Sequence, residues 1–269
     1  MNRKSPMVSV IIPCYNQGKY IEKTIQSVLA STYPNFEIIV INDGSTDFLT
    51  NEIFNTNSWP KTRIINTKNV GVAEARNIAI KHSTGKYILP LDGDDKISSG
   101  YLKDAVEILD NNPNIKVVSC EVRFFGNKFG VYNLPDYSLE NLLRQNILVV
   151  SSFFRRDDFD KTIGYNPNMI YGHEDWDFWL SLLESGGDVH KIPKVHFYYR
   201  IRKKSRNRSM EDEHYKFLQN QIFENHKELY LKHFINPRLT IEYSMVYRLK
   251  KYCLDKILHS PFKYFRFLK

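Results

Sequence analysis

The stretch that decides the fold is residues 8–41, VSVIIPCYNQGKYIEKTIQSVLASTYPNFEIIVI. Its two ends, residues 8–12 and 37–41, are short, apolar and rich in β-branched side chains, which is typical of strands buried on both faces of a sheet. Between them, residues 19–30 place apolar side chains at helical spacing and predict an amphipathic helix. A strand, a helix and a strand in this order predict a βαβ unit with a right-handed crossover.

The alternation of strand and helix patterns continues along the next part of the chain. Strands are predicted at residues 63–65, 86–91 and 115–122, and helices at residues 72–82 and 98–109. This alternation is typical of an α/β fold with a Rossmann-like, mainly parallel sheet flanked by helices. Ligands of such sheets bind beyond the carboxyl ends of the strands, so we expect the functional site at that edge.

After about residue 123 the pattern is less regular. Gly126 and Gly130, among aromatic pairs, predict a hairpin or a strand extension, and residues 195–201 predict a further strand. A helix is predicted to begin near Glu174, with acidic residues in its first turn, and to end at Gly186 and Gly187. The remainder, from about residue 211, reads as helical and basic.

The composition excludes several classes of protein. The 269 residues are 42% hydrophobic and 25% charged, which excludes disorder, collagen and a disulfide miniprotein. No apolar run approaches the roughly 20 residues of a membrane-spanning helix, and the first residues lack the apolar core of a secretion signal. We therefore expect a cytoplasmic chain. Cys14, Cys120 and Cys253 have no metal-ligand spacing and are expected to be reduced and structural.

The positive charge is concentrated in the C-terminal third. The formal net charge is +8, and residues 190–269 contain 19 Lys and Arg against 7 Asp and Glu. Such a segment suits a nucleotide diphosphate, an anionic bilayer or nucleic acid. Nucleic acid is the weakest of these, because the segment has no recognisable recognition motif. A dinucleotide-dependent oxidoreductase and a P-loop enzyme are excluded because neither G-x-G-x-x-G nor a P-loop follows the first strand.

The strongest candidate for chemistry is the acidic stretch at residues 91–95, LDGDD. Its carboxylates, Asp92, Asp94 and Asp95, follow an apolar strand and raise one another's pKa unless a cation or hydrogen-bond donors compensate them. Mg²⁺ uses one or two protein carboxylates and takes its remaining ligands from water and substrate phosphates. The alternative is an acidic turn that precedes the predicted helix at residues 98–109.

Three further features each allow a functional and an ordinary interpretation. Asp43 follows a strand, although an Asp before a Gly also forms ordinary turns. Glu174 and Asp175 begin a helix, where acids are common, but nearby tryptophans would shield a carboxylate and bring its pKa nearer neutrality, unless they are simply core residues. The run at residues 200–208 holds six cations, which form either a solvated loop or a clamp on a leaving diphosphate.

Five motifs, in order and spacing, resemble family 2 of the glycosyltransferases. They are VSVIIPCYN (residues 8–16), EIIVINDGSTD (37–47), N-x-G-V-A-x-A-R-N (69–77), LDGDD (91–95) and EDWDFW (174–179). The resemblance covers about residues 7–209 and implies the glycosyltransferase A fold. It also implies a nucleotide-diphospho-sugar donor, with a UDP-sugar expected, and inversion at the anomeric carbon.

The resemblance divides the chain into parts. It implies a nucleotide-sugar-binding catalytic domain at residues 1–209, with a donor half at about 1–122 and an acceptor half at about 123–209. Residues 210–269 are then a helical, basic C-terminal extension.

The resemblance also assigns residues to the donor. Residues matching its donor-binding segments are Pro13, Tyr15 and Asn16 in the first loop, Asp43 as the acid that reads the nucleobase, and Asn69 and Arg76 flanking the nucleotide. Asp92 and Asp94 match the D-x-D motif, which contacts the ribose and a diphosphate bridged by a divalent metal, Mn²⁺ or Mg²⁺.

The catalytic and leaving-group residues follow from the same comparison of motifs. Asp175 matches the general base, with Glu174 as the runner-up. Arg202 and Ser205, in the basic run, are expected to bind the donor. Arg202 stands where many members have a histidine that ligates the metal, so an arginine here is expected to take over part of the phosphate neutralisation.

The implied function is a metal-dependent hexosyl- or N-acetylhexosaminyltransferase that acts on a glycan or lipid-linked saccharide in cell-surface polysaccharide synthesis. The alternative is a catalytically inactive nucleotide-sugar or glycan-binding module.

Residues 243–269 combine an apolar stripe with Lys and Arg, which predicts peripheral attachment to an anionic membrane at its inner face. The alternative is that this segment packs on the catalytic domain or forms a homo-oligomer.

Overall fold

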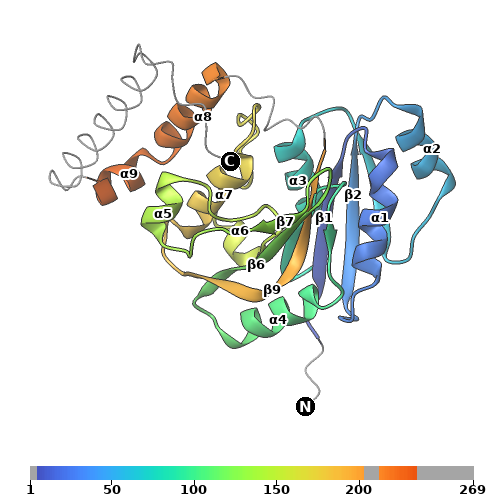
Figure 1. The fold of residues 1–269 in the computed structure, drawn as a ribbon, viewed down its shortest axis with the longest axis horizontal. Helices are drawn as coiled ribbons and strands as arrows, with labels where there is room; N and C mark the ends of the chain where they lie inside the picture. The colour runs from blue at the N-terminus through green and yellow to red at the C-terminus, as the bar shows by residue number, and fades with distance from the viewer. Residues whose placement is uncertain (1–4, 203–211, 235–269) are drawn as a thin grey trace, which may run out of the picture. The chain divides into compact units, whose positions relative to one another are not determined.

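The computed structural model describes residues 5–202 and 212–234 of the chain. The chain divides into two compact units, Met1–Asn225 and His226–Lys269. The first is built on one mixed sheet of nine strands flanked by helices (Figure 1). Of the second, the structure describes one helix, α9 (Lys227–Phe234). The predicted domain boundary after residue 209 falls within residues 203–211, outside the described part, and stays a prediction.

The first half of the sheet is parallel, as the βαβ pattern predicts. Strand β1 (Val8–Cys14) lies between β2 (Phe36–Asp43) and β4 (Tyr87–Pro90), and β2 pairs in turn with β3 (Thr62–Thr67). Every residue of β1 is buried, which explains why its sequence is apolar without alternation. The prediction of an α/β fold with helices beside the sheet is confirmed.

The second half of the sheet mixes directions. The two long strands β6 (Ile115–Gly126) and β9 (Asp188–Ile201) are parallel to each other. Antiparallel to their neighbours are β5 (Lys96–Ile97), β7 (Gly130–Tyr132) and β8 (Phe153–Arg155). Strand β7 forms the hairpin with β6 that the glycines predict. The strand order is β3-β2-β1-β4-β8-β6-β9-β5, with β7 added beside β6.

The helices agree with the sequence patterns to within a few residues where a pattern was clear. The helices of the first unit are α1 (Gly18–Leu29), α2 (Phe48–Thr56), α3 (Val72–Lys81), α4 (Tyr101–Asn111), α5 (Leu139–Arg144), α6 (Arg156–Phe159), α7 (Glu174–Leu183) and α8 (Asp212–Asn225). The helix expected from residue 98 begins at Tyr101 instead, because Ser98 N–H donates to the His196 carbonyl and continues the pairing of β5 with β9.

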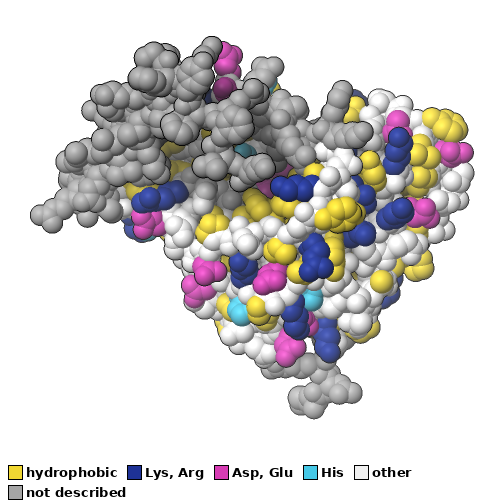
Figure 2. Space-filling view, in the orientation of Figure 1, with side chains coloured by type: hydrophobic (Ala, Val, Ile, Leu, Met, Phe, Trp, Pro, Cys, Tyr) yellow, Lys and Arg dark blue, Asp and Glu magenta, His cyan; other side chains and the backbone are white. Residues whose placement is uncertain are grey.

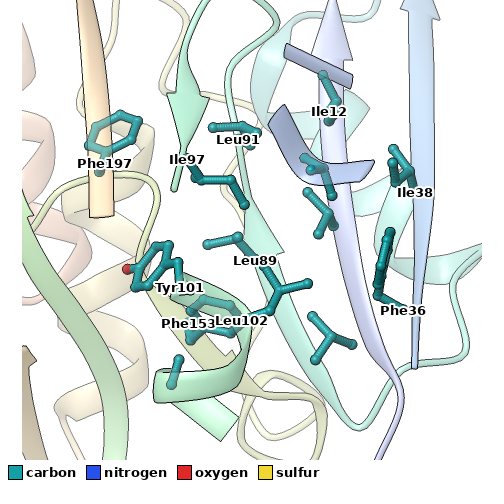
Figure 3. Close-up of a cluster of buried hydrophobic side chains, with 14 of the residues drawn as sticks. Ile12, Phe36, Ile38, Leu89, Leu91, Ile97, Tyr101, Leu102, Phe153 and Phe197 are labelled. Carbon is teal, nitrogen blue, oxygen red and sulfur yellow. The ribbon is translucent and has the colours of Figure 1, made fainter. Parts of the chain in front are cut away.

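A hydrophobic core between the sheet, α1 and α4 fixes the edge that carries the acidic loop. Figure 3 shows side chains from β1, β2, β4, β5, β9 and α4 meeting in this core. Leu89, Leu91 and Ile97 all belong to it, so the chain is anchored immediately before and after residues 92–95. Among the described residues, no helix has both the length and the apolar character needed to cross a membrane. On the face seen in Figure 2, charged side chains of both signs are interspersed with hydrophobic ones over the described surface.

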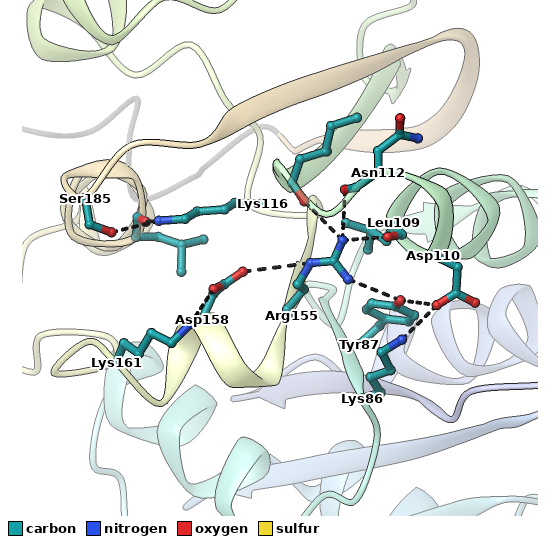
Figure 4. Close-up of polar contacts among 12 residues, drawn as sticks. Lys86, Tyr87, Leu109, Asp110, Asn112, Lys116, Arg155, Asp158, Lys161 and Ser185 are labelled. Atoms are coloured by element: carbon teal, nitrogen blue, oxygen red, sulfur yellow. Dashed lines mark hydrogen bonds and ion pairs between the residues drawn. The ribbon is translucent and has the colours of Figure 1, made fainter.

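Polar contacts fix the start of β4, the end of the strand that lies away from the acidic loop. Figure 4 shows Arg155 of β8 donating to the carbonyl oxygens of Leu109 (2.5 Å), in the last turn of α4, and Asn112 (3.1 Å), just beyond that helix. Lys86 pairs with Asp110 at 2.8 Å in the same network. These contacts lie at the start of β4, whereas the acidic loop follows the end of that strand. They therefore stabilise the sheet without taking part in the site.

Candidate active site

The loops that follow β1 and β2 are joined into one wall at the carboxyl edge of the sheet. The side-chain oxygen of Asn16 accepts hydrogen bonds from the main-chain N–H groups of Thr46 (2.8 Å) and Asp47 (3.1 Å). Asn16 itself has a left-handed backbone, with φ 54°, which Asn tolerates better than most residues. Pro13 is buried at the end of β1, while Tyr15 is exposed beside Asn16.

The predicted nucleobase acid, Asp43, is buried at the end of β2. Its two carboxylate oxygens accept from the main-chain N–H groups of Val70 (2.8 Å) and Gly71 (3.0 Å). Asp43 therefore shapes the loop before α3, in which the predicted Asn69 is exposed. Gly44 is required at this point, because it has φ +66° and an added Cβ would lie 2.5 Å from the Asn69 nitrogen. Contacts of Asp43 and Asn69 with a nucleotide stay predictions.

Each carboxylate of the acidic loop faces an arginine. Asp92 accepts from Arg76 at 2.8 Å, and the Arg202 Nε lies 2.9 Å from Asp94 Oδ2. Asp95 accepts from the main-chain N–H of Arg200 at 2.7 Å. The compensation for three neighbouring carboxylates thus comes from two guanidinium groups, those of Arg76 and Arg202, and from the main-chain N–H of Arg200.

The acidic loop keeps basic carboxylates and unpaired acceptor oxygens in spite of these arginines. Burial raises the pKa of Asp94 to about 6, against the opposing charge of Arg202. Burial, together with the charges of Asp94 and Asp92, raises the pKa of Asp95 well above its ordinary value. Two buried acceptor oxygens, Asp95 Oδ2 and Gln17 Oε1, have no hydrogen-bond partner. The loop therefore favours the approach of further positive charge.

The predicted metal site at Asp92 and Asp94 stays a prediction, because these residues would supply only part of the ligand shell of a divalent cation. In the described part of the chain, no group of three or more His, Cys, Asp or Glu side chains is arranged to hold a metal ion. Asp92 and Asp94 would supply two carboxylates, and Mg²⁺ commonly binds one or two and completes its shell with phosphates and water. His196, which pairs with Asp104 at 3.2 Å, takes no part in this cluster.

Arg76 connects the acidic loop to the predicted base. Its guanidinium donates to Asp92 and, at 2.9 Å, to Glu174 at the start of α7, and the residue is 1% exposed. Burial alone would lower the pKa of Arg76, but Asp92 and Glu174 raise it, so the guanidinium stays charged. The structure places the Arg76 side chain in the interior. A contact of Arg76 with the donor stays a prediction.

Asp175, the predicted general base, lies at the first turn of α7 and is partly buried. Burial and the neighbouring Glu174 raise the pKa of Asp175 to about 6, while the charge of Arg76, the Trp176 N–H that donates to Asp175 at 2.8 Å and, last, the Asn146 side chain oppose the shift. The sequence allowed two roles for Trp176 and Trp179, to shield the carboxylate from water or to pack in the core. Both are buried core residues, at 2% and 0% exposure.

Several residues of the site were missed in the sequence. Thr24, on the buried face of α1, has its hydroxyl 2.7 Å from the Asp95 carbonyl oxygen and 3.0 Å from that of Gly93. Gln17 donates to Asp94 at 3.2 Å, and Asn146 contacts Asp175. Gln17 is adjacent to a recognised motif and was within reach of sequence reasoning, whereas nothing in the local pattern marks Thr24 or Asn146.

Other predictions concern residues outside the described part. Ser205, Cys253 and the membrane segment at residues 243–269 all lie there. Cys14 and Cys120 are buried free cysteines, as expected, and burial raises the pKa of each thiol to about 12.

Known proteins resemble this chain in sequence. The chondroitin synthase of Pasteurella multocida (strain Pm70) is 33% identical over 196 residues, which are 69% of this chain and 20% of that protein. The hyaluronan synthase of Pasteurella multocida is 33% identical over 196 residues, 69% of this chain and 19% of that protein. The chain therefore spans about a fifth of the length of these two relatives.

Solved structures show the same fold. Residues 1–349 of S. aureus TarS in complex with UDP-GlcNAc match with a TM-score of 0.64 and 21% identity, over 86% of this chain and 74% of that one. The same TarS segment in complex with UDP matches with a TM-score of 0.60 and 21% identity, over 84% and 73%. The family model described as Glycosyl transferase family 2 matches residues 9–227. Because that match takes in most of the chain, this protein belongs to glycosyltransferase family 2.

Proposed function

We propose that this chain is an inverting glycosyltransferase that moves a hexosyl or N-acetylhexosaminyl group from a UDP-sugar to a saccharide acceptor. The observation that carries the proposal is the Arg76 bridge, which joins Asp92 of the acidic loop to Glu174, the neighbour of Asp175. The bridge supports a single site made by the proposed diphosphate-binding loop and the candidate base, although Asp92 and Asp175 are 83 residues apart in sequence. The UDP and UDP-GlcNAc complexes of TarS support the donor class.

The leaving group requires positive charge at the acidic loop. Negative charge develops on the diphosphate as the glycosidic bond breaks, and a divalent cation held by Asp92 and Asp94 supplies Lewis-acid stabilisation when bound. Arg202, at 2.9 Å from Asp94, lies where its guanidinium can bind the same phosphates.

The acceptor requires a base. With a pKa raised to about 6, Asp175 is ionised at neutral pH and is still a stronger base than an ordinary carboxylate. It would take the proton of the acceptor hydroxyl as that oxygen attacks the anomeric carbon. Inversion is supported because a retaining mechanism needs a second carboxylate as nucleophile, and Glu174, the neighbour of Asp175 in sequence, is buried and paired with Arg76.

The experiment that tests the proposal is the Asp175→Asn variant. We expect sugar transfer to fall by at least about a thousandfold, the order by which a general base contributes, while UDP affinity measured by calorimetry stays within a factor of two or so. The matched control is Asp157→Asn, at an exposed site on α6. Equal loss of UDP affinity would contradict the assignment of Asp175 as the base.

The acceptor and the cellular setting are also proposals. The relatives named chondroitin and hyaluronan synthase support a glycan acceptor in polysaccharide synthesis. If the chain binds UDP-sugar but neither transfers nor hydrolyses it, the inactive binding module is the correct interpretation.

Co-sedimentation with anionic vesicles, with and without residues 240–269, tests the predicted peripheral attachment.

A further inference from the structure

One face of the sheet, beside the acidic loop, carries a row of side chains that crosses four strands. Lys96 of β5 pairs with Tyr198 of β9, and Tyr198 pairs on its other side with Arg123 of β6. Arg123 in turn pairs with Val131 of β7. Lys96 and Tyr198 are partly exposed, and Arg123 and Val131 are exposed. Because residues paired across neighbouring strands point to the same face of a sheet, these side chains form one row that solvent can reach.

A second row next to the first brings a third cation onto this face. Phe125 and Arg200 pair with each other, two residues beyond Arg123 and Tyr198 in their strands, so they share the same face. Two cations contact the Phe125 ring, since Lys96 Nζ lies 4.5 Å and the Arg200 guanidinium 4.2 Å from its centroid. The two rows therefore combine cations with aromatic rings and contain no acid.

Acids nearby do not cancel the charge of these cations. Arg123 forms no ion pair with any residue in the described part of the chain. Asp94 pairs with Arg202 at 2.9 Å. Asp95 is 1% exposed, and burial raises its pKa well above the ordinary value, which disfavours its charged form. Glu121, the acid of β6, lies beyond both rows. The face therefore favours an anionic occupant.

The same face leads towards the candidate base. Ser119 lies on the same side of β6 as Arg123, because side chains alternate along a strand. Together with Ile147, Ser119 lines a cavity of about 220 Å³. Asn146, the residue before Ile147, contacts Asp175. A long ligand that lies along this face would therefore reach the loop beside the base.

We propose that this face binds the acceptor and that the acceptor is an acidic saccharide with carboxylate groups along its chain. The residues of this cationic face are Lys96, Arg123, Phe125, Val131, Tyr198 and Arg200. The inference rests on the proposed function and deepens it, because it names the chemical class of the acceptor.

The chemistry of the cationic face matches such a chain. Lys96 and Arg123 lie two strands apart, roughly 10 Å, so they suit separate carboxylates better than one compact diphosphate. Arginine binds carboxylates through paired hydrogen bonds, and aromatic rings cover the apolar faces of sugar rings. An anionic bilayer fits less well, because Phe125 and Tyr198 are only partly exposed, whereas attachment to a bilayer needs an apolar surface that enters it.

The test is the binding of tetragalacturonate, which carries a carboxylate on every sugar, compared with neutral maltotetraose of the same length. In calorimetry without nucleotide at low salt, we expect the wild type to bind tetragalacturonate at least about tenfold more tightly than maltotetraose. Arg123→Gln should weaken tetragalacturonate binding roughly threefold, the order of one exposed ion pair, and Arg123→Glu should weaken it further. Arg123→Lys keeps the charge and should stay within about twofold of the wild type. Equal binding of the two saccharides by the wild type would overturn the proposal.

The matched control separates this face from a general effect of net charge. Lys103→Gln removes an exposed cation from α4, which packs in the core on the other side of the sheet with Val122 and Phe197. This variant should bind tetragalacturonate as the wild type does. Equal weakening by Lys103→Gln and Arg123→Gln would overturn the assignment of the face.

Two further measurements distinguish the other outcomes. Phe129, between β6 and β7, is 76% exposed. If Phe129→Ser and Arg123→Gln both release the chain from phosphatidylglycerol vesicles while tetragalacturonate binding is unchanged, the face is a membrane surface and the proposal is wrong. Absence of UDP binding by the wild type would instead overturn the proposed function, and the saccharide comparison, made without nucleotide, would still stand.

Discussion

At the scale of single residues, the chemistry depends on how the protein sets the basicity of Asp175. Burial and the charge of Glu174 disfavour the carboxylate form, and the charge of Arg76, the Trp176 N–H and the Asn146 side chain favour it. Because the base acts only when it is ionised, kcat/KM should decline as the pH falls through about 6. The Asn146 side chain is itself fixed, since its Oδ1 accepts from the Leu148 N–H at 3.2 Å.

This arrangement makes Asn146 a positioning residue with a measurable signature. In Asn146→Ala the carboxylate loses a donor, so the pKa of Asp175 should rise and the acid limb of the pH profile of kcat/KM should move upward by roughly half a unit to one unit. UDP affinity should not change. Asn141→Ala, at an exposed position on α5, is the control. An acid limb that stays in place would show that Asn146 does not act on the base.

At the scale of elements, the close packing of α1 against α2 positions the loops that follow β1 and β2. Gly18 opens α1, and its N–H donates to the Thr50 hydroxyl at 2.7 Å. A Cβ added at Gly18 would lie 2.6 Å from the Thr50 nitrogen and 2.9 Å from the Leu49 carbonyl carbon. Both are backbone atoms, so the two helices would have to move apart.

We expect Gly18→Ala to lower the free energy of unfolding by about 1–3 kcal/mol, as overpacking against backbone does. Gly100→Ala is the matched control, because an added Cβ there meets only the His196 ring, at 3.6 Å, and should change stability by no more than about 0.5 kcal/mol. Urea unfolding of the two variants measures the difference. Equal effects would mean that the α1–α2 contact relaxes freely.

The elements that sequence reasoning missed are those with weak or short patterns. Helix α2 has one buried residue, Thr50, and exposes Phe48 at 78%. Only Ile53 and Phe54 of its apolar residues pack against the core, and both are partly buried, so its apolar pattern is weak. Strand β8 is three residues long, which is too short for any periodicity to be detected. Their positions follow from pairing and packing with distant elements.

At the scale of the whole molecule, Arg76 holds the donor-side sheet and the base-bearing helix together. It lies on α3 and pairs with Asp92 after β4 and with Glu174 on α7, 98 residues away. An ion pair at the surface contributes little to stability, but removal of one partner from a buried pair leaves an uncompensated charge in the interior. This cross-link should therefore matter for stability as well as for function.

We expect Arg76→Met to lower the free energy of unfolding by about 3–5 kcal/mol, and the additional change Glu174→Gln to restore part of that loss by removing the buried charge. The exposed pair Lys86–Asp110 is the comparison, and Lys86→Gln should cost about 1 kcal/mol or less. Chemical unfolding of the three variants tests this. If Arg76→Met costs no more than Lys86→Gln, the bridge does not hold the two parts together.

The sequence by itself determined the parallel α/β core and the chemical types at its edge. Continuous apolar runs produced β1 and β2, an amphipathic stripe produced α1, and the acids at positions 92, 94, 174 and 175 follow or begin such elements. These features depend on periodicity over a few residues, which is visible in one sequence. Only the tertiary structure decided which charges meet. Arg76 reaches Glu174 and Arg202 reaches Asp94 because strand order and helix packing bring distant segments together, and no local pattern encodes that distance.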